Sequence, residues 1–292
     1  MSARYRVDHL THYTYTAPVS QSWQLARLAP RELAGQKLLS HALHIDPRPD
    51  ERHDALDSFG NTVTHFGLHG AHHLLRVQMQ CEVEVADRPA LPKAARATVR
   101  AVRQGLHDDP MQDDLNAARL ANPTLLVPFS DAAHRFAAEH LRPERDWFEA
   151  VHALMATIHA EFEFDPNATT VSTAVDEVLQ HRRGVCQDFA HLMLACLRSH
   201  GLPARYMSGY LLTDPPPGQP RLMGADATHA WVAAYLPRHG WVEFDPTNRQ
   251  LADRRYITLA WGADFADVVP LRGVILGGGE QTLEVEVSVI PR

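Results

Sequence analysis

The sequence predicts an α+β protein, and three stretches with different hydrophobic periods support that prediction. Before about residue 90, apolar and polar residues alternate, as they do in half-buried strands. Between about residues 131 and 200, apolar residues recur every three or four positions, which is typical of amphipathic helices. After residue 204 the alternation returns. We therefore expect an N-terminal antiparallel β-domain over residues 1–95, a connecting segment over 96–130, and a mixed core with C-terminal strands over 131–292.

The N-terminal strands are clearest in "RVQMQCEVEV". Its apolar side chains share one face and its polar side chains the other; the apolar set is Val77, Met79, Cys81, Val83 and Val85. This alternation is typical of an antiparallel sheet that packs one face on a core. Prolines interrupt any regular pattern in "DRPALPKAARA" and "ANPTLLVPFSD", so we interpret that part of the chain as a connection.

Three helices are predicted in the next part of the chain. The first has helical spacing of its apolar residues, which are Trp147, Phe148, Val151, Leu154, Met155 and Ile158. The second lies in "TTVSTAVDEVLQHRRG", where Thr173 is the expected N-cap and Asp176 completes a variant capping box. The third begins in "GVCQDFAHLMLACLRSHGLP" and ends near Gly201.

Paired strands are expected to follow these helices. The segments "HAWVAAYL" and "WVEFDPT" are joined by "PRHG" and are predicted to form an antiparallel hairpin. The tail "RGVILGGGEQTLEVEVSVIPR" is predicted to form a C-terminal β-hairpin, since its glycines suit a turn.

The composition restricts the class of protein. Of the 292 residues, 45 % are apolar and 22 % charged, which is typical of a soluble globular protein. A net charge of −7 without a long basic run argues against a nucleic-acid or membrane partner. The first residues lack the apolar stretch of a secretory signal, and no apolar run reaches the roughly 20 residues of a membrane span. Three cysteines are too few for a framework of disulfides, so we expect a protein of the reducing cytoplasm. The sequence leaves open whether the protein forms a homo-oligomer.

Cys186 differs from the other two cysteines in its position. Cys81 and Cys196 occupy apolar positions of a strand and a helix, where a cysteine packs as a small hydrophobic residue. Cys186 instead lies where a helix begins. There, unpaired backbone N–H groups and the helix dipole stabilise a thiolate, which is the reactive form of cysteine. Gly184, two residues earlier, allows a sharp turn and a close approach by a substrate.

A nucleophilic cysteine needs a base, and the base needs a group that orients it. The predicted hairpin offers His229 and Asp245. If its loop has an odd number of residues, such as 236–240, Tyr235 pairs with Trp241. His229 and Asp245 then lie on one face as diagonal neighbours. An even loop would place them on opposite faces.

This order of Cys, His and Asp carries a resemblance. The segments "GVCQDFAHLMLACLRSHGLPARYMSGYL" and "HAWVAAYLPRHGWVEFDPTN" resemble the core of the transglutaminase-like superfamily, in particular its bacterial branch, often described as cysteine proteases. The segments "HLTHYTYTAPVSQSWQLARLAPR" and "DSFGNTVTHF" resemble the β-domain that precedes the core in that branch, and "RGVILGGGEQTLEVEVSVIP" resembles its closing strands. The resemblance spans nearly the whole chain and is weakest across residues 90–130. It implies a papain-like core.

The resemblance also implies roles for three residues, with Cys186 as nucleophile, His229 as base and Asp245 as orienting group. Such a triad opens an amide through a thioester acyl-enzyme, which water resolves by hydrolysis and an amine by transamidation. We favour a cysteine-dependent hydrolase of peptide or protein amides. A transglutaminase is the alternative, and a non-catalytic peptide-binding module is a second alternative.

The groups around the triad are less specific. The backbone N–H of Cys186 is the expected first donor to an oxyanion. The family frequently has a tyrosine in the segment that matches "FEFDPN", where this chain has Phe164, which leaves the second donor open. Gln187 is a candidate for that donor, with an ordinary polar residue at the helix start as the alternative. Trp231 and Trp241 are candidates for walls of the cleft, with core packing as the alternative.

Histidines in "HFGLHGAHH" raise the alternative of a metal site. The cluster comprises His65, His69, His72 and His73. On a helix, His65 and His69 would converge as zinc ligands do. Gly67 and Gly70 interrupt such a helix and the region has the pattern of a strand, so we expect no metal and no cofactor.

Overall fold

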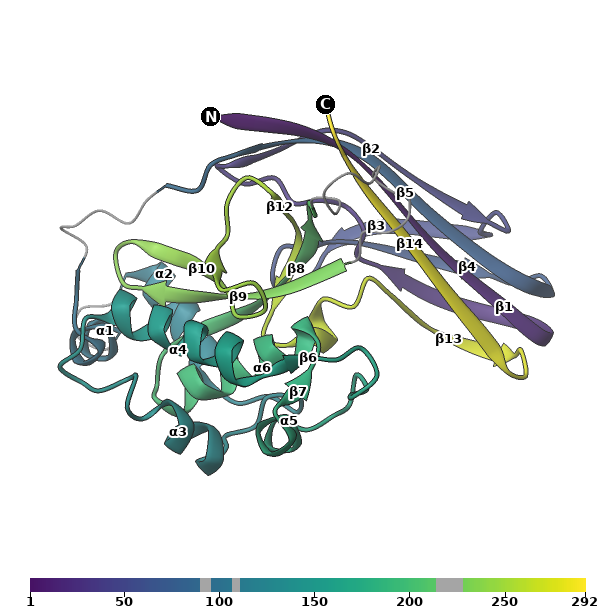
Figure 1. Cartoon of the computed structure of the whole chain (residues 1–292). Coiled ribbons are helices and arrows are strands. Elements are labelled where there is room, and N and C mark those ends of the chain that lie inside the picture. The colour runs from purple at the N-terminus through teal and green to yellow at the C-terminus, as the bar shows by residue number, and fades with distance from the viewer. Residues whose placement is uncertain (90–95, 107–110, 214–227) are drawn as a thin grey trace, which may run out of the picture.

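The computed structural model describes residues 1–89, 96–106, 111–213 and 228–292. It contains an N-terminal β-domain beside a core of helices and strands, and the first and last residues lie near each other on the β-domain (Figure 1). The α+β fold class is thereby confirmed.

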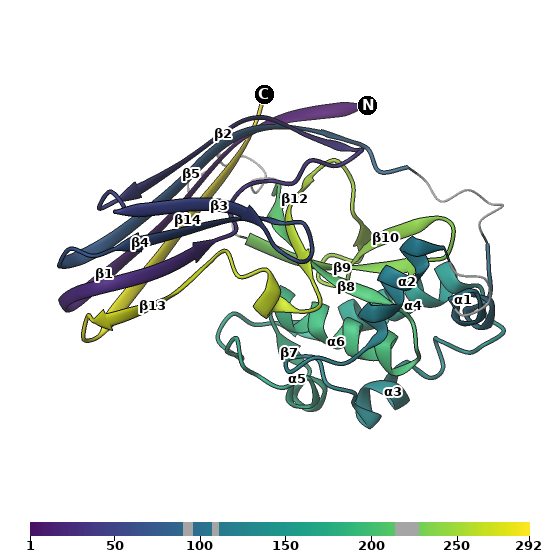
Figure 2. The ribbon, with the colours of Figure 1, turned by 180° about the vertical axis from the view of Figure 1, so that it is seen from behind.

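The β-domain is organised around the long strand β1 (Ser2–Ala26). Six further described strands complete its sheet: β2 (Gln36–Asp46), β3 (Glu51–Leu56), β4 (Thr62–Leu68), β5 (His72–Ala86), β13 (Leu271–Gly277) and β14 (Gln281–Pro291). Strand β1 bends back, and β13 turns into β14, at the end of the domain that lies farthest from the core (Figures 1 and 2). Residues 5–15 of β1 pair with β5 and β14, and residues 22–26 pair with β4 and β13. The five apolar side chains predicted to share a face in residues 77–85 are all buried.

The C-terminal strands correct the predicted hairpin. A glycine-rich turn joins β13 to β14, but the two strands pair with β1 instead of with each other. Residues 277–279 have φ between 65° and 92°, which glycine adopts readily. The turn between β13 and β14 lies beside the point where β1 bends, and there the Ala17 N–H donates to the carbonyl of Gly278 at 3.0 Å. One half of β1 pairs with β13 and the other half pairs with β14. Residues 271–291 therefore belong to the N-terminal sheet and not to the core.

The core contains a five-stranded antiparallel sheet in the order β11-β10-β9-β8-β12. These strands are β8 (Ala204–Leu211), β9 (Thr228–Leu236), β10 (Gly240–Asp245), β11 (Gln250–Leu251) and β12 (Tyr256–Gly262), and a short parallel pair joins β6 (Glu163–Phe164) to β7 (Arg183–Gly184). The helices are α1 (Val99–Gly105), α2 (Gln112–Ala118), α3 (Asp131–Ala137), α4 (Trp147–Glu161), α5 (Val175–His181) and α6 (Cys186–Ser199), with 3-10 turns η2 (Arg119–Ala121) and η3 (Phe265–Asp267). Helix α6 packs against β9 and β8 (Figure 1).

The predicted helices correspond to α4, α5 and α6. Helix α6 begins at Cys186, and its residues 188–198 are all buried. The predicted capping box of α5 is wrong, because its N-cap is Ala174. The Thr173 hydroxyl instead accepts a hydrogen bond from the Thr170 N–H, and Asp176 accepts one from Ser130.

The connecting segment has structure of its own. Within residues 96–130 the chain forms α1, α2 and η2. Val99, Val102 and Ala117 are buried side chains of these helices. The buried side chains of α1 and α2 therefore attach this segment to the core, while Leu125 and Phe129 are exposed.

The β-domain pairs with the core through side-chain amides at the edge strand β12. Gln36 donates to the Thr258 carbonyl and accepts from the Thr258 N–H, both at 2.8 Å. Asn61 contacts the backbone of Trp261 in the same way, at 2.8 and 3.0 Å. A side-chain amide has an N–H donor and a C=O acceptor, which are the same groups that the backbone of a neighbouring strand presents to an edge strand. The two domains are thus joined by hydrogen bonds of the kind that hold a sheet together.

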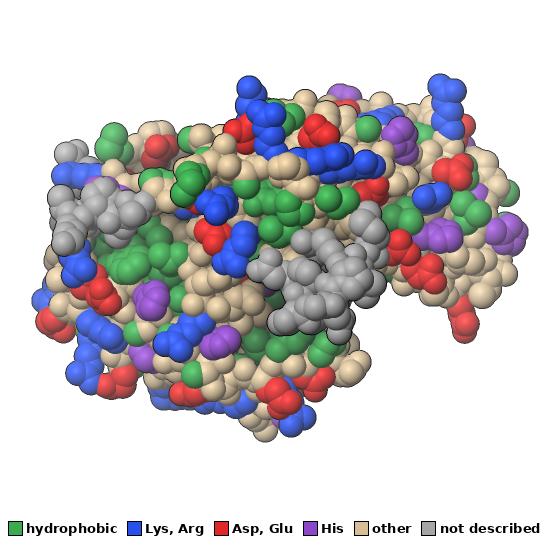
Figure 3. Space-filling view, turned by 45° about the horizontal axis from the view of Figure 1, so that its top comes forward, with side chains coloured by type: hydrophobic (Ala, Val, Ile, Leu, Met, Phe, Trp, Pro, Cys, Tyr) green, Lys and Arg blue, Asp and Glu red, His purple; other side chains and the backbone are tan. Residues whose placement is uncertain are grey.

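Charge is distributed evenly on the face shown in Figure 3, where basic and acidic side chains are interspersed. Among the described helices, none has both the length and the apolar character that crossing a bilayer requires.

Candidate active site

Cys186 is the first residue of α6, directly after the N-cap Val185. The first turn is held by Asp188, whose Oδ2 accepts from the Val185 N–H at 2.7 Å and from the Thr169 hydroxyl at 2.6 Å. A Cβ at position 184 would lie 2.8 Å from the Cβ of Asp188, so only Gly184 allows this approach. The thiol is partly exposed, while the thiols of Cys81 and Cys196 are buried. The predicted helix start is therefore confirmed.

The hairpin of β9 and β10 has the register that the sequence allowed. Tyr235 pairs with Trp241, and Leu236 pairs with Gly240 across a three-residue turn. The odd loop places His229 and Asp245 on the same face. Their side chains meet with 2.7 Å between His229 Nε2 and Asp245 Oδ2.

His229 hydrogen-bonds to Asp245 and is close enough to Cys186 for the thiol to act on its pKa. Since Nε2 is engaged by Asp245, Nδ1 is the ring nitrogen left to serve the thiol. Burial lowers the pKa of His229, but its interactions with Asp245 and Cys186 outweigh burial and raise the pKa to about 10. Burial likewise raises the pKa of Asp245, and its hydrogen bonds to His229, Tyr256 and Asn248 lower it below its ordinary value. The arrangement favours an imidazolium between two acceptors.

Asp245 is fully buried and accepts five hydrogen bonds. Its Oδ1 accepts from the N–H groups of Thr247 and Asn248. Its Oδ2 accepts from His229, from the Asn248 amide at 2.7 Å and from the Tyr256 hydroxyl at 2.6 Å. The Gln250 amide donates in turn to the Tyr256 hydroxyl. Such a carboxylate has little freedom to rotate and holds the imidazole in one orientation.

The sequence prediction missed Asn248 and Tyr256. Asn248 stands three residues after Asp245 in "DPTN", where an Asx-type turn is a usable signal. Tyr256 begins β12, two strands away from β9, and nothing in its local pattern points to Asp245.

The three candidates for the surroundings of the triad, Gln187, Trp231 and Trp241, have different environments. Trp231 is fully buried and lies beside the His229 ring, with centroids 6.1 Å apart and planes 19° apart, so it supports the imidazole. The Gln187 amide donates to the Val171 carbonyl at 3.1 Å, so it is engaged away from the oxyanion role. Trp241 does not reach the triad: it contacts Tyr235 and Arg205 toward the other end of the sheet.

The histidine cluster lies on strands of the β-domain. His65 in β4 pairs with His53 in β3, His69 lies 3.5 Å from a Glu51 oxygen, and His72 faces the Gly70 carbonyl. In the part of the chain that the structure describes, no three His, Cys, Asp or Glu side chains gather as metal ligands would.

Comparisons with known proteins agree with this architecture. Residues 5–84 match the bacterial transglutaminase-like N-terminal region, and residues 134–246 match the transglutaminase-like superfamily. An uncharacterized protein of Mycobacterium tuberculosis is 39 % identical over 305 residues, which cover 99 % of this chain and 93 % of that protein. A protein-glutamine gamma-glutamyltransferase of Pseudomonas aeruginosa is 34 % identical over 110 residues, covering 35 % of this chain and 16 % of that protein.

A solved structure shares the whole fold. The "putative cysteine protease" of Cytophaga hutchinsonii superposes with a TM-score of 0.76 at 19 % identity, covering 100 % of this chain and 91 % of that one. With both family regions in order along the chain, and a relative similar over its full length, this protein belongs to the transglutaminase-like superfamily.

Proposed function

We propose that this protein is a cysteine-dependent hydrolase of peptide or protein amides, acting through a thioester on Cys186. The observation that carries the proposal is one arrangement of side chains: the thiol at the start of α6 acts on the pKa of His229, and His229 hydrogen-bonds to Asp245. A nucleophile, a base and an orienting carboxylate in this order are what acyl transfer requires.

In the acylation step, the Cys186 thiolate attacks the amide carbonyl carbon, and a C–S bond forms while the carbonyl electrons move to oxygen. The backbone N–H of Cys186, at the open end of the helix, stabilises that oxyanion. The intermediate collapses to a thioester as the C–N bond breaks, and the His229 imidazolium gives its proton to the departing amine. Cys186 then carries the acyl group.

In the deacylation step, neutral His229 takes a proton from water, and the resulting hydroxide attacks the thioester. The C–S bond breaks, the acid leaves, and the thiolate and imidazolium are restored. Asp245 remains ionised throughout and stabilises the positive ring, while Trp231 limits the tilt of the ring.

Transfer of the acyl group to an amine is the second candidate. The similarity to the Pseudomonas aeruginosa transferase over 110 residues supports it. We place hydrolysis first because water needs no second binding site, whereas an amine does.

Selective alkylation tests the triad. Iodoacetamide is applied at mildly acidic pH, where ordinary thiols are protonated, and the modified cysteine is found by mass spectrometry. Cys186 is expected to react, with the buried Cys81 and Cys196 as internal controls. The His229→Ala variant is expected to lose this reactivity. Equal labelling of the variant and the wild type would remove the basis of the proposal.

A library of peptides and simple amides tests the reaction, with and without an added amine. Mass spectrometry follows a thioester on Cys186, and the product distinguishes hydrolysis from transfer. Cys186→Ala is the blank. If neither an adduct nor a product depends on Cys186, the protein is a binding module instead of an enzyme.

A further inference from the structure

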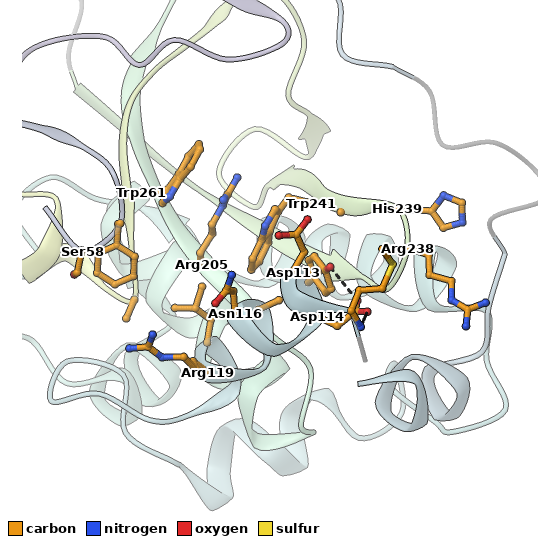
Figure 4. Close-up of a pocket in the computed structure, with 17 residues that line it drawn as sticks. Ser58, Asp113, Asp114, Asn116, Arg119, Arg205, Arg238, His239, Trp241 and Trp261 are labelled. Atoms are coloured by element: carbon orange, nitrogen blue, oxygen red, sulfur yellow. Dashed lines mark hydrogen bonds between the residues drawn. The ribbon is translucent and has the colours of Figure 1, made fainter. Parts of the chain in front are cut away.

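A large cavity lies away from the triad, on the same face of the core sheet. Arg205, which lines this cavity, pairs with Ala233, four residues from His229 on β9, so the two places are about 13 Å apart along that strand. The cavity has a volume of about 880 Å³. Its walls come from the turn between β3 and β4, from α2 and η2, from the β9–β10 hairpin and from β12 (Figure 4).

Arg205 is the charged side chain at the centre of this cavity. Only 8 % of the residue is exposed. Its guanidinium lies between two indole rings, 4.3 Å from the centre of Trp241 and 3.7 Å from that of Trp261 (Figure 4). Stacking covers the faces of a guanidinium but leaves its N–H groups, which lie in its plane, without acceptors.

No side chain or carbonyl in the described ranges accepts a hydrogen bond from Arg205, and its Nε is buried without a partner. Glu243 is the acidic neighbour that acts on its charge, but the Glu243 oxygens already bind the Trp231 indole at 2.8 Å and Arg88 at 3.3 Å. Arg31 stacks on Trp261 at 3.5 Å and adds a second positive charge. Burial lowers the pKa of Arg205 to about 9; Glu243 opposes this shift and Arg31 adds to it.

Arg182 is a second arginine that stacks on aromatic rings, and unlike Arg205 it also binds a carboxylate. Its guanidinium lies 5.0 Å from the Phe136 ring and 4.7 Å from the Phe162 ring. It also binds the Glu161 carboxylate at 2.8 Å. Arg205 is more deeply buried, and a buried charge without a hydrogen-bonded counter-charge is costly. What its surroundings lack is an acceptor.

We propose that this cavity binds an organic carboxylate, which Arg205 holds between Trp241 and Trp261. The planar fork of a guanidinium matches the two oxygens of a carboxylate. The indole rings and Phe59 line the space for the organic part of the ligand. Asp113 and Asp114 line the cavity, but so do Arg119 and Arg238, so the preference for an organic carboxylate over inorganic phosphate rests on the aromatic lining. The carboxylate can be a peptide C-terminus, an acidic side chain or a small organic acid.

The indole N–H signals of the protein give a local readout. The chain has five tryptophans, and Trp→Phe variants assign their signals in a ¹⁵N spectrum. The full chain carrying Cys186→Ala is titrated with N-acetylphenylalanine, N-acetylglutamate α-amide, benzoate and inorganic phosphate, and with N-acetylphenylalanine amide as the uncharged match. The carboxylates are expected to shift the signals of Trp241 and Trp261 and leave that of Trp23 in place. Their ranking distinguishes the three sources.

Arg205→Gln is expected to weaken carboxylate binding by ~10-fold or more, and Arg205→Lys, which keeps the charge without the fork, by less. Arg182→Gln is the matched control and should bind as the wild type does. If Arg205→Gln does not fold, the comparison of N-acetylphenylalanine with its amide in the Cys186→Ala protein still tests the proposal. Equal binding of acid and amide, tighter binding of phosphate, shifts confined to other tryptophans, or no binding of any carboxylate would each overturn the proposal.

Discussion

Asp245 and Arg205 are both buried, charged and on the same face of the core sheet, where they lie on β10 and β8, the two neighbours of β9. Asp245 accepts five hydrogen bonds, and these bonds orient His229 beside Cys186. Arg205 has two aromatic rings and no acceptor in the described part of the chain. The Asp245 carboxylate has all its hydrogen-bond partners within the protein, so it holds His229 in place. The Arg205 guanidinium has no acceptor among the described residues, so it is suited to bind one from a ligand.

Removing Asp245 should have the largest effect. Asp245→Ala leaves the His229 imidazolium without its counter-charge, and we expect a loss of about 3–5 kcal/mol in the free energy of unfolding. The rate of selective Cys186 alkylation should fall about a thousandfold or more. Asp114→Ala is the control, because Asp114 also accepts from a tyrosine hydroxyl, that of Tyr235. It should lower stability alone; an unchanged alkylation rate in Asp245→Ala would contradict the assigned role.

The pH dependence of stability should separate the two charges. Folding raises the pKa of His229 from 6.5 to about 10, so the folded protein binds that proton more tightly than the unfolded chain. Its contribution is complete below pH 6.5 and is lost as the pH rises through about 10. Urea unfolding across this window should show stability decreasing in the wild type and a flatter slope in His229→Gln. Between pH 6.5 and about 8, below the pKa of about 9 that Arg205 has in the folded protein, Arg205→Gln should leave the slope unchanged. Parallel slopes for the wild type and His229→Gln would contradict the shift.

Tyr256→Phe should have a smaller effect, because it removes one of five donors to Asp245. We expect a loss of about 1–2 kcal/mol in the free energy of unfolding and slower alkylation of Cys186. Tyr235→Phe removes a matched hydroxyl, which donates to Asp114 at 3.0 Å. It should cost similar stability and leave alkylation unchanged. Equal alkylation rates in the two variants would mean that Tyr256 has no positioning role.

Arg205→Met should have the smallest effect on stability. It removes a buried charge that has no hydrogen-bonded acceptor and whose acidic neighbour Glu243 also pairs with Arg88, at the cost of about 1 kcal/mol of cation–π attraction. Without ligand, we expect thermal and urea unfolding to show a protein as stable as the wild type or more stable. A loss beyond about 2 kcal/mol would show that Arg205 has a structural partner after all.

The parts of the site that the sequence predicted are those fixed by local rules. The start of α6 follows from a helical stripe that begins after Gly184, and the shared face of His229 and Asp245 follows from the parity of one loop. Trp241 shows the limit of the parity argument: it lies on the same face, but parity does not say how far from the triad.

What the sequence could not predict depends on contacts between distant segments. Tyr256 reaches Asp245 only because the sheet brings β12 near, and Arg205 in "ARYMSGYL" has the pattern of any strand residue until its burial is known. The glycines of residues 277–279 suggested a turn, and the pattern held no sign that β1 would accept both strands beside it.

The pairing of β14 with β1 also sets the order in which the protein can assemble. Residues 5–15 are synthesised before the whole core, yet they pair with residues 281–291, which follow the core. A nascent chain therefore holds one side of β1 without its partner while the helices and strands of the core are made. An unpaired strand edge promotes association between chains, and contacts this distant in sequence form slowly. The N-terminal sheet is thus completed only after the core has been made, and until β14 arrives one side of β1 is open to association with other chains.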